Sequence, residues 1–148
     1  MSPHKEEMKP LRTIYLALTS GVAMIFAIMV FLIKDEMHSD GKSVYFIAAC
    51  CVVLSAIFIS NKLFKAGLSK AAQNVSWKEL DAFEDYRTKK IMQWTLIEGS
   101  TLVSLILMFL DENFLIAAPA FAGLVMLIFS HAREEEFNDH YHISESLD

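Results

Sequence analysis

The sequence predicts an all-α integral membrane protein with four transmembrane helices, arranged as two antiparallel hairpins. Hydrophobic residues make up 54% of the 148 positions, charged residues make up only 21%, and the mean hydropathy is +0.37. Soluble domains are about half apolar and a quarter charged, so this chain is more apolar than they are. The apolar residues also cluster into four long runs, which is the stronger observation.

The predicted spans cover residues 12–33, 43–62, 90–110 and 113–130. Uncharged stretches of 21, 19 and 18 residues lie in the first, second and fourth spans, and a 20-residue stretch of the third holds one carboxylate. A helix rises about 1.5 Å per residue, so each stretch matches a hydrocarbon core about 30 Å thick. A soluble bundle would instead need four helices that are apolar on every face.

The distribution of basic residues predicts the orientation. Eleven of the thirteen Lys and Arg residues lie before the first span, between the second and third, or after the fourth. Only Lys34 and Lys42 lie in the first connection, and the third connection has none. We expect the protein in the cell (inner) membrane. The positive-inside rule then places both termini and the central loop in the cytoplasm.

The central loop, residues 63–89, is predicted to be a cytoplasmic helical segment. Ser76 and Glu79 have the spacing of a capping box, so a helix should begin at Trp77 and continue into the third span. Residues 67–74 then form the turn, unless the loop lies on the membrane surface as an amphipathic segment. In the first arrangement, five side chains could pack as a small cytoplasmic extension: Leu63, Phe64, Leu80, Phe83 and Arg87.

The third connection, residues 111–113, is short enough that the third and fourth spans must be antiparallel neighbours, with Asn113 as the cap of the fourth. A weak internal similarity also relates the first span to the third with an offset of 78 residues. It leaves open whether the two halves form a parallel repeat or match by chance.

Glu98 is the one ionisable residue inside a predicted span, which makes it the candidate proton- or ion-binding residue. A carboxylate in hydrocarbon should face the bundle interior, and hydroxyl or amide groups at a similar depth could serve as its partners. The competing interpretation is a hydrogen-bonded Glu that only holds helices together. The expected partners are Thr19, Ser20, Gln93 and Thr95.

Small residues and one proline indicate how the later helices pack. Small residues four positions apart let helix backbones approach closely in lipid. Pro119 removes a backbone hydrogen bond within the fourth span and is a candidate hinge, although a tolerated bend is the simpler interpretation. The predicted packing residues are Gly99, Ser100, Ser104, Ala118 and Ala122.

The tail, residues 131–148, is predicted to be an acidic and solvated cytoplasmic segment. If the fourth helix continued into it, His131, Glu135 and His142 would share one helix face with the chemistry of a zinc or iron site. The spacing is poor for such a site, so we predict neither a metal nor another cofactor.

The sequence alone does not specify an activity. It contains no phosphate-binding loop, redox motif or catalytic constellation, so we do not predict an enzyme, and we expect no nucleic-acid partner. Two function classes then remain, and both place the chain in a lipid bilayer. The first is an accessory or scaffolding subunit that packs on a larger membrane complex, and the second is a small homo-oligomeric proton- or cation-coupled transporter or channel that uses Glu98. The expected partners are the lipid bilayer and either other membrane-protein subunits or further copies of the chain.

Overall fold

The computed structural model describes residues 4–33, 39, 41–73 and 77–141, and these residues form helices and no strand. The prediction of an all-α protein is therefore confirmed for this part of the chain. In order, the elements are α1 (His4–Ile33), α2 (Val44–Ala72), α3 (Glu79–Asp111), the short 3₁₀ helix η1 (Phe114–Ile116), α4 (Ala117–Phe129) and α5 (Glu134–His140).

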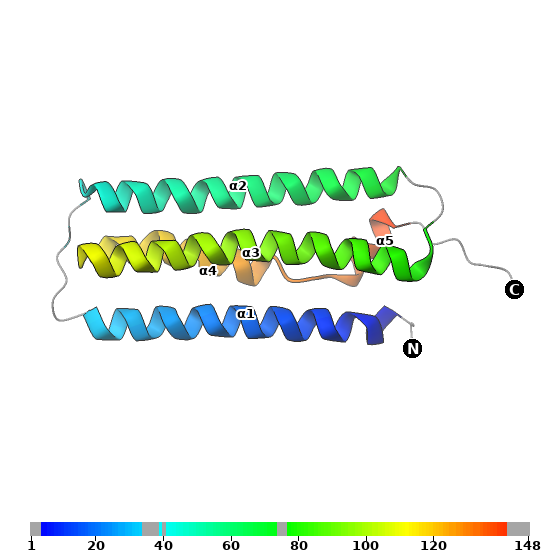
Figure 1. Ribbon diagram of the computed structural model, residues 1–148, viewed down its shortest axis with the longest axis horizontal. Coiled ribbons are helices and arrows are strands. Elements are labelled where there is room, and N and C mark those ends of the chain that lie inside the picture. Colours follow the sequence, from blue (N-terminus) through cyan, green and yellow to red (C-terminus); the bar gives the residue numbers. More distant parts are fainter. Residues whose placement is uncertain (1–3, 34–38, 40, 74–76, 142–148) are drawn as a thin grey trace, which may run out of the picture.

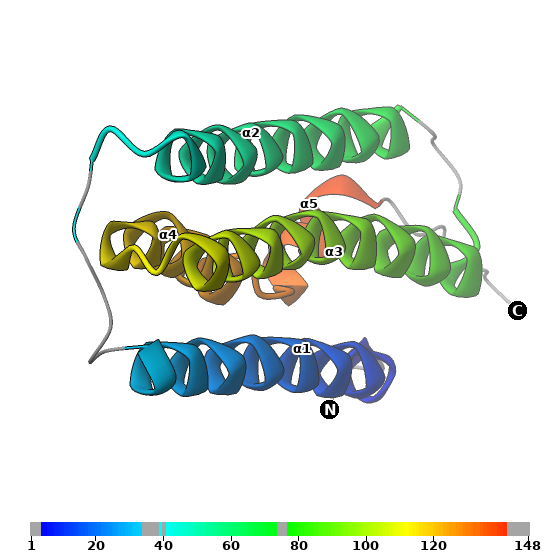
Figure 2. The same cartoon turned by 60° about the vertical axis from the view of Figure 1, so that its left-hand side comes forward.

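Helices α3 and α4 form the centre of the molecule, with α1 and α2 on opposite sides of them (Figures 1 and 2). α3 contacts all three other long elements, and α4 packs along it as the predicted antiparallel partner. The predicted first hairpin is not a packed pair, because α3 and α4 separate its two helices. The two halves of the chain are thus arranged differently, and the fold gives the proposed internal repeat no support.

Among the described residues, three helices are long and apolar enough to cross a membrane: Met8–Leu32, Val44–Ala72 and Leu80–Asp111. The segment Phe114–Phe129, which contains η1 and α4, meets this criterion only together with α5, and the two parts are bent by 68°. The predicted unbroken helix from the central loop into the third span is confirmed, since α3 has 33 residues, or about 50 Å.

The junction between α2 and α3 is shorter than predicted. Helix α2 continues to Ala72 through the segment expected to turn, with Gly67 inside the helix. A Cβ atom on Gly67 would lie 2.9 Å from Cε of Lys89, so the glycine lets α3 approach closely. Helix α3 begins at Glu79 rather than Trp77, and Ser76 of the predicted capping box lies outside the described residues.

The predicted packing between the ends of α2 and α3 is confirmed in part. Phe64 and Phe83 are buried in the core, whereas Leu63 and Leu80 are 54% and 64% exposed and Arg87 is also exposed. The buried side chains at the ends of these two helices belong to one apolar core that also includes residues of α1, α4 and α5.

The start of the fourth span confirms the predicted cap and shows where Pro119 lies. Asn113 accepts a hydrogen bond from the Leu115 N–H at 3.1 Å, as predicted for a cap. Pro119 lies in the first turn of α4 rather than in the middle of a helix, which fits the interpretation of a tolerated proline. A first-turn N–H has no partner within its helix, so its loss costs little, and the irregularity is the change from η1 to α4 just before it.

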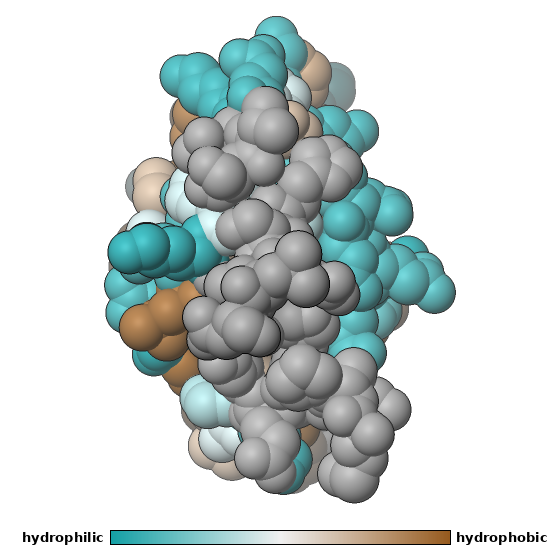
Figure 3. Space-filling model, turned by 90° about the vertical axis from the view of Figure 1, so that its right-hand side faces the viewer, coloured by the Kyte–Doolittle hydropathy of each residue, from teal (hydrophilic) through white to brown (hydrophobic). Residues whose placement is uncertain are grey.

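The body of the bundle exposes apolar side chains, whereas one end is polar. In the most apolar 18-residue stretch of α1, only 6% is buried, whereas in the corresponding stretch of α3 the buried share is 44%. Phe31 of α1 and Leu54 of α2 are 70% and 64% exposed. Seen from the end near α5, the surface is instead largely hydrophilic around the grey residues (Figure 3).

Candidate functional site

The predicted site at Glu98 is not assembled in the structure. Glu98 lies on α3 and is only partly buried, and no hydrogen bond or ion pair joins its carboxylate to another described residue. Its position on the helix is at the margin of the buried face, with Leu102 one turn further on. Within this chain Glu98 lies at the edge of the buried face rather than in its centre, and a proton- or ion-binding role for it stays a prediction.

The side chains predicted beside this carboxylate form other contacts. Thr95 and Ser20 each donate their hydroxyl to a carbonyl of their own helix, at 2.8 and 3.2 Å. Gln93 is buried and donates Nε2 to Oδ1 of Asn61 at 2.8 Å. The Thr19 hydroxyl is buried and has no hydrogen-bond partner among the described residues. These four residues do not form one site.

The predicted packing residues divide into two groups. Ser100 and Ser104 are buried, as predicted, with exposed fractions of 6% and 0%. Gly99, Ala118 and Ala122 are exposed, so they do not mediate packing within the chain. Their spacing of four describes one helix face correctly, but it does not say whether that face meets α3, α4 or the surroundings.

The closest approach between α3 and α4 is made by a pair that the sequence analysis did not select. A Cβ atom on Gly123 would lie 2.2 Å from Oγ1 of Thr101, which is a clash that real structures do not contain. Thr101 is fully buried and donates its hydroxyl to the Ile97 carbonyl at 2.8 Å. Gly123 therefore allows α4 to lie against the threonine.

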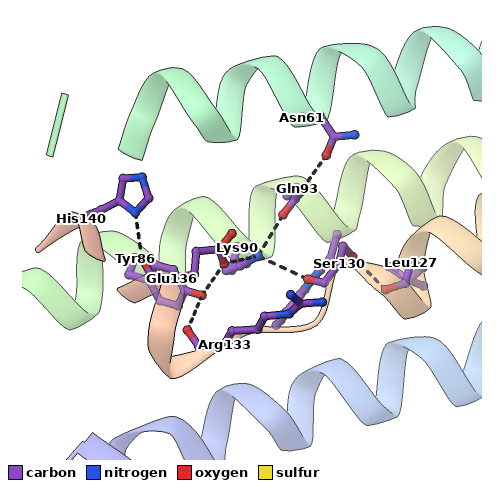
Figure 4. A network of polar contacts seen from close by, with 10 residues as sticks. Asn61, Tyr86, Lys90, Gln93, Leu127, Ser130, Arg133, Glu136 and His140 are labelled. Carbon is purple, nitrogen blue, oxygen red and sulfur yellow. Dashed lines mark hydrogen bonds and ion pairs between the residues drawn. The ribbon is translucent and has the colours of Figure 1, made fainter. Parts of the chain in front are cut away.

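A buried ionic cluster lies where α2, α3, α5 and the end of α4 meet (Figure 4). Its centre is Lys90, which is only 2% exposed and whose Nζ lies 2.8 Å from Oε2 of Glu136. The Tyr86 hydroxyl donates to the same carboxylate oxygen at 2.9 Å. Nζ also lies 3.4 Å from Oε1 of Gln93 and 4.1 Å from the centre of the Phe64 ring. We call these five residues the Lys90 cluster.

Helix periodicity brings the Lys90 cluster together. Tyr86, Lys90 and Gln93 are spaced by four and three residues on α3, so their side chains share one face. A lysine ammonium needs a paired carboxylate when it is removed from water. Helix α5 supplies it, because Glu136 and the buried Phe137 are adjacent in sequence and both reach α3.

A second set of contacts fastens the end of α5. Tyr141 is 3% exposed, its ring stacks on Phe137 at 5.0 Å, and its hydroxyl donates to Oδ2 of Asp85 at 2.6 Å. Lys89 forms an ion pair with Asp85 as well. Burial and, next, the bond to Asp85 raise the pKa of the Tyr141 hydroxyl, so it stays protonated and remains a donor.

Side chains from two other helices bind the carbonyls at the end of α4. The Trp94 indole donates to the Ser130 carbonyl at 2.9 Å, and the Tyr15 hydroxyl donates to the Ile128 carbonyl at 2.8 Å. The last carbonyls of a helix have no partner within it, so these donors satisfy groups that would otherwise be unpaired. They also join α1, α3 and α4 at one level.

The tail is therefore not the solvated segment that we predicted, as far as residue 141. Composition suggested solvation because three glutamates follow one another, but Phe137 and Tyr141 lie one helical turn apart and bury their rings together. That spacing of four was the available signal. The partners of Glu136 lie more than 40 residues away in the sequence, and no local pattern identifies them.

The weak metal candidates are not brought together. Residues 131–133 are not helical, so His131 does not share a helix face with Glu135, and both side chains are exposed. His142 lies outside the described residues. Among the described residues, no group of three or more His, Cys, Asp or Glu side chains could hold a metal ion.

Two cavities open at the polar end. One, of about 680 Å³, lies between α2 and the segment from α4 to α5, with Lys90 and Gln93 among its lining residues. The other, of about 830 Å³, lies between α1 and residues 131–135, where Arg12 pairs with Glu134 at 3.4 Å. Both cavities are lined by charged and apolar side chains together, which suits amphipathic rather than purely polar ligands.

Comparison with protein-family models, curated proteins and solved structures finds no match to this chain. Its function is therefore inferred from its own residues. The Lys90 cluster holds a carboxylate and an ammonium in contact, so its chemistry suits fixing α5 against α3.

Proposed function

We propose that this chain is a four-span membrane protein with both termini in the cytoplasm, and that it serves as an accessory or scaffolding subunit of a membrane complex. The observation that carries this proposal is the exposed apolar surface of α1. Only 6% of its most apolar 18-residue stretch is buried. A helix of this kind needs lipid or another membrane helix beside it.

A common apolar layer supports the spanning arrangement. Tyr15, Trp94 and Ser130 meet at one level, and Asn61 bonds to Gln93 close to it. Counted from this level, α1, α2 and α3 each continue for about 18 residues, or about 27 Å, and η1 with α4 spans about 25 Å. Tyr and Trp side chains are enriched at membrane interfaces, which fits the donors found there.

Beyond this level the chain forms a polar extension made by the ends of α2 and α3 together with α5. The basic residues of the central loop lie on this side, so the positive-inside rule assigns it to the cytoplasm. An accessory subunit needs a fixed surface for its partners, and the docked α5 supplies one.

The small residues on the outside of the bundle support association with another helix. A Cβ atom on Gly21 or on Gly99 would meet nothing within 4 Å, and Ala118 and Ala122 are exposed. In lipid, such positions allow a partner's backbone to come close. The transporter alternative is less well supported. Glu98 lies only four residues, or about 6 Å, beyond Trp94, and three of its four expected partners, Ser20, Gln93 and Thr95, bond elsewhere.

The experiment for this proposal is a mild-detergent pull-down of the tagged chain from its native membrane, followed by measurement of the mass of the intact assembly. We expect a different membrane protein in stoichiometric amount. The variant Gly21→Leu should lose that protein and keep its own fold, because a Cβ atom there meets nothing within 4 Å. Leu16→Ala, at an exposed position of α1, should retain it. A homo-oligomer or a lone monomer would contradict the accessory role.

Insertion and orientation need a separate experiment. In a background with Cys50→Ala and Cys51→Ala, a membrane-impermeant maleimide should label Ser39→Cys in intact cells and Ser69→Cys only after permeabilisation. Both residues are exposed in the structure. The chain should also stay in the membrane during alkaline carbonate extraction. Release by carbonate, or the opposite labelling pattern, would contradict the proposed topology.

A further inference from the structure

We propose that the cavity of about 680 Å³ between α2 and the α4–α5 segment binds the headgroup of a cytoplasmic-leaflet phospholipid that carries a primary ammonium, as phosphatidylethanolamine does. This inference rests on the proposed membrane insertion. We call the cavity the α2–α5 cleft; it is bounded by Asn61, Lys65, Lys90, Ser130 and Asp139 among others.

The position of the α2–α5 cleft fits a headgroup. Ser130 lines it and also accepts the Trp94 indole bond that marks the edge of the apolar layer. Met126 and Phe129 of α4 line the cleft on the apolar side of this level, and Phe129 is 68% exposed. Acyl chains can therefore lie along α4 while a headgroup occupies the polar part.

The charges of the α2–α5 cleft are balanced. Lys90 and Glu136 neutralise each other at 2.8 Å. Besides the two histidines of the lining, His131 and His140, this leaves two cationic and two anionic side chains. All four are exposed, and none is in an ion pair with another described residue: Lys65, Arg133, Glu135 and Asp139. Unpaired charges of both signs that line one cleft are complementary to a ligand that itself carries a positive and a negative group.

A headgroup with both a phosphate and a primary ammonium fits this lining better than other lipid headgroups. Lys65 and Arg133 can bind the phosphate, and a guanidinium does so with two parallel hydrogen bonds. The ammonium can donate to Glu135 and Asp139. A purely anionic headgroup would meet two carboxylates, and a choline headgroup has no N–H to donate to them. Basic pockets between membrane helices bind anionic lipid headgroups, so a pocket with both signs of charge favours a headgroup that carries both signs.

The test uses the full-length chain, purified in detergent and transferred to bilayers of phosphatidylcholine with either phosphatidylethanolamine or phosphatidylglycerol added. Native mass spectrometry then counts the lipids that stay bound. We expect retention of about one phosphatidylethanolamine per chain, in preference to the other two lipids by about tenfold, which is the change expected from one or two charge-assisted hydrogen bonds.

Two variants and two controls test the contacts. Lys65→Gln combined with Arg133→Gln, and Glu135→Gln combined with Asp139→Asn, should each lower retention of phosphatidylethanolamine by about tenfold. Lys70→Gln and Asp81→Asn change exposed charges outside the cleft and should leave it unchanged. Unfolding temperatures measured in parallel confirm that each variant is folded.

Three results would overturn the inference. They are equal retention of all three lipids, a preference for phosphatidylglycerol, and saturation by free phosphoethanolamine with no added effect of the acyl chains, which would make the ligand a soluble phosphate compound. Failure of the proposed function gives different results from failure of this inference. The chain would then be released by carbonate extraction, or the pull-down would contain no foreign partner. A membrane-embedded chain without a lipid preference contradicts this inference alone.

Discussion

The polar end and the apolar body of this bundle are held together in different ways. At the polar end, side chains from distant parts of the sequence bond to one another, as Lys90 does to Glu136 and Tyr141 does to Asp85. In the body, the buried hydroxyls of Ser100 and Thr101 bond to their own helix, and much apolar surface stays exposed. The end is thus complete in one chain, whereas the body depends on what surrounds it.

The largest expected effect is on the polar end. Glu136→Ala leaves the Lys90 ammonium buried without its carboxylate, and we expect the free energy of unfolding to fall by about 2–4 kcal/mol. Denaturation in mixed micelles measures this loss, and limited proteolysis should show that α5 is released. Glu84→Ala, an exposed carboxylate at the same polar end of the bundle, is the control and should change neither. If the two variants behaved alike, the Lys90 cluster would not be holding α5.

A combined variant sharpens this prediction. Lys90→Met with Glu136→Leu removes both charges at once, so no unpaired ion is left in the interior. Apolar replacement of a buried ion pair is often neutral, and most of the lost stability should return. A double variant as unstable as Glu136→Ala would mean that the ion pair itself, rather than the avoidance of an unpaired charge, stabilises the docked tail.

The next effect is on the apolar body, where two glycines can be compared. Gly123→Ala places a methyl group 2.2 Å from Oγ1 of Thr101, so α3 and α4 must separate, and we expect a loss of about 1–3 kcal/mol. Gly99→Ala meets no atom within 4 Å and should be neutral or stabilising, since alanine is the better helix former. Thr101→Ala in the Gly123→Ala background should restore much of the loss. Equal effects of the two glycine changes would contradict the close approach.

A smaller effect concerns the end of α5. Tyr141→Phe removes the bond to Asp85 and should cost about 1 kcal/mol, seen as faster amide hydrogen exchange in residues 134–141. Because the folded-state pKa of Tyr141 is raised, its contribution is complete below the ordinary tyrosine pKa of about 10 and is lost as the pH rises through the folded value. Tyr45→Phe is the control, because Tyr45 is 45% exposed. Exchange that does not respond to Tyr141→Phe would show that stacking alone holds this end.

The smallest effect is expected at Glu98. Glu98→Gln should change stability by less than about 0.5 kcal/mol and leave insertion and assembly intact, because the carboxylate has no partner among the described residues. Mixed-micelle denaturation and the mass of the assembly check this. A loss of proton- or cation-linked transport in vesicles, with normal assembly, would instead support the transporter alternative.

The parts of this structure that follow from local sequence were predictable. Uncharged runs predict the long helices, and the unbroken course of α3 and the cap at Asn113 follow from local patterns. The docking of α5 could not be predicted in the same way. Lys89 and Lys90 are neighbours with the same chemistry, yet their side chains are 20% and 3% exposed.

The candidate site was predicted less well than the fold, for a physical reason. Glu98 was selected because a charge in an apolar run is conspicuous, but its environment depends on helix rotation and on depth from the interface. The buried pair was hidden because Lys90 belongs to the basic end of a span and Glu136 to a run of glutamates. Only the three-dimensional fold shows which of several equivalent charges leaves the water.

The bonds that Tyr15 and Trp94 make to the end of α4 set the axial register of the bundle. A slide of α4 by one residue moves its carbonyls about 1.5 Å along the axis and would break both the 2.8 Å and the 2.9 Å bonds at once. Piston motion of α4 alone is therefore opposed from two sides. Helix α2 is held close to the same level, because Gln93 of α3 donates to Asn61 at 2.8 Å. Sliding of any one of the four long helices against the rest would therefore disturb a side-chain bond between helices.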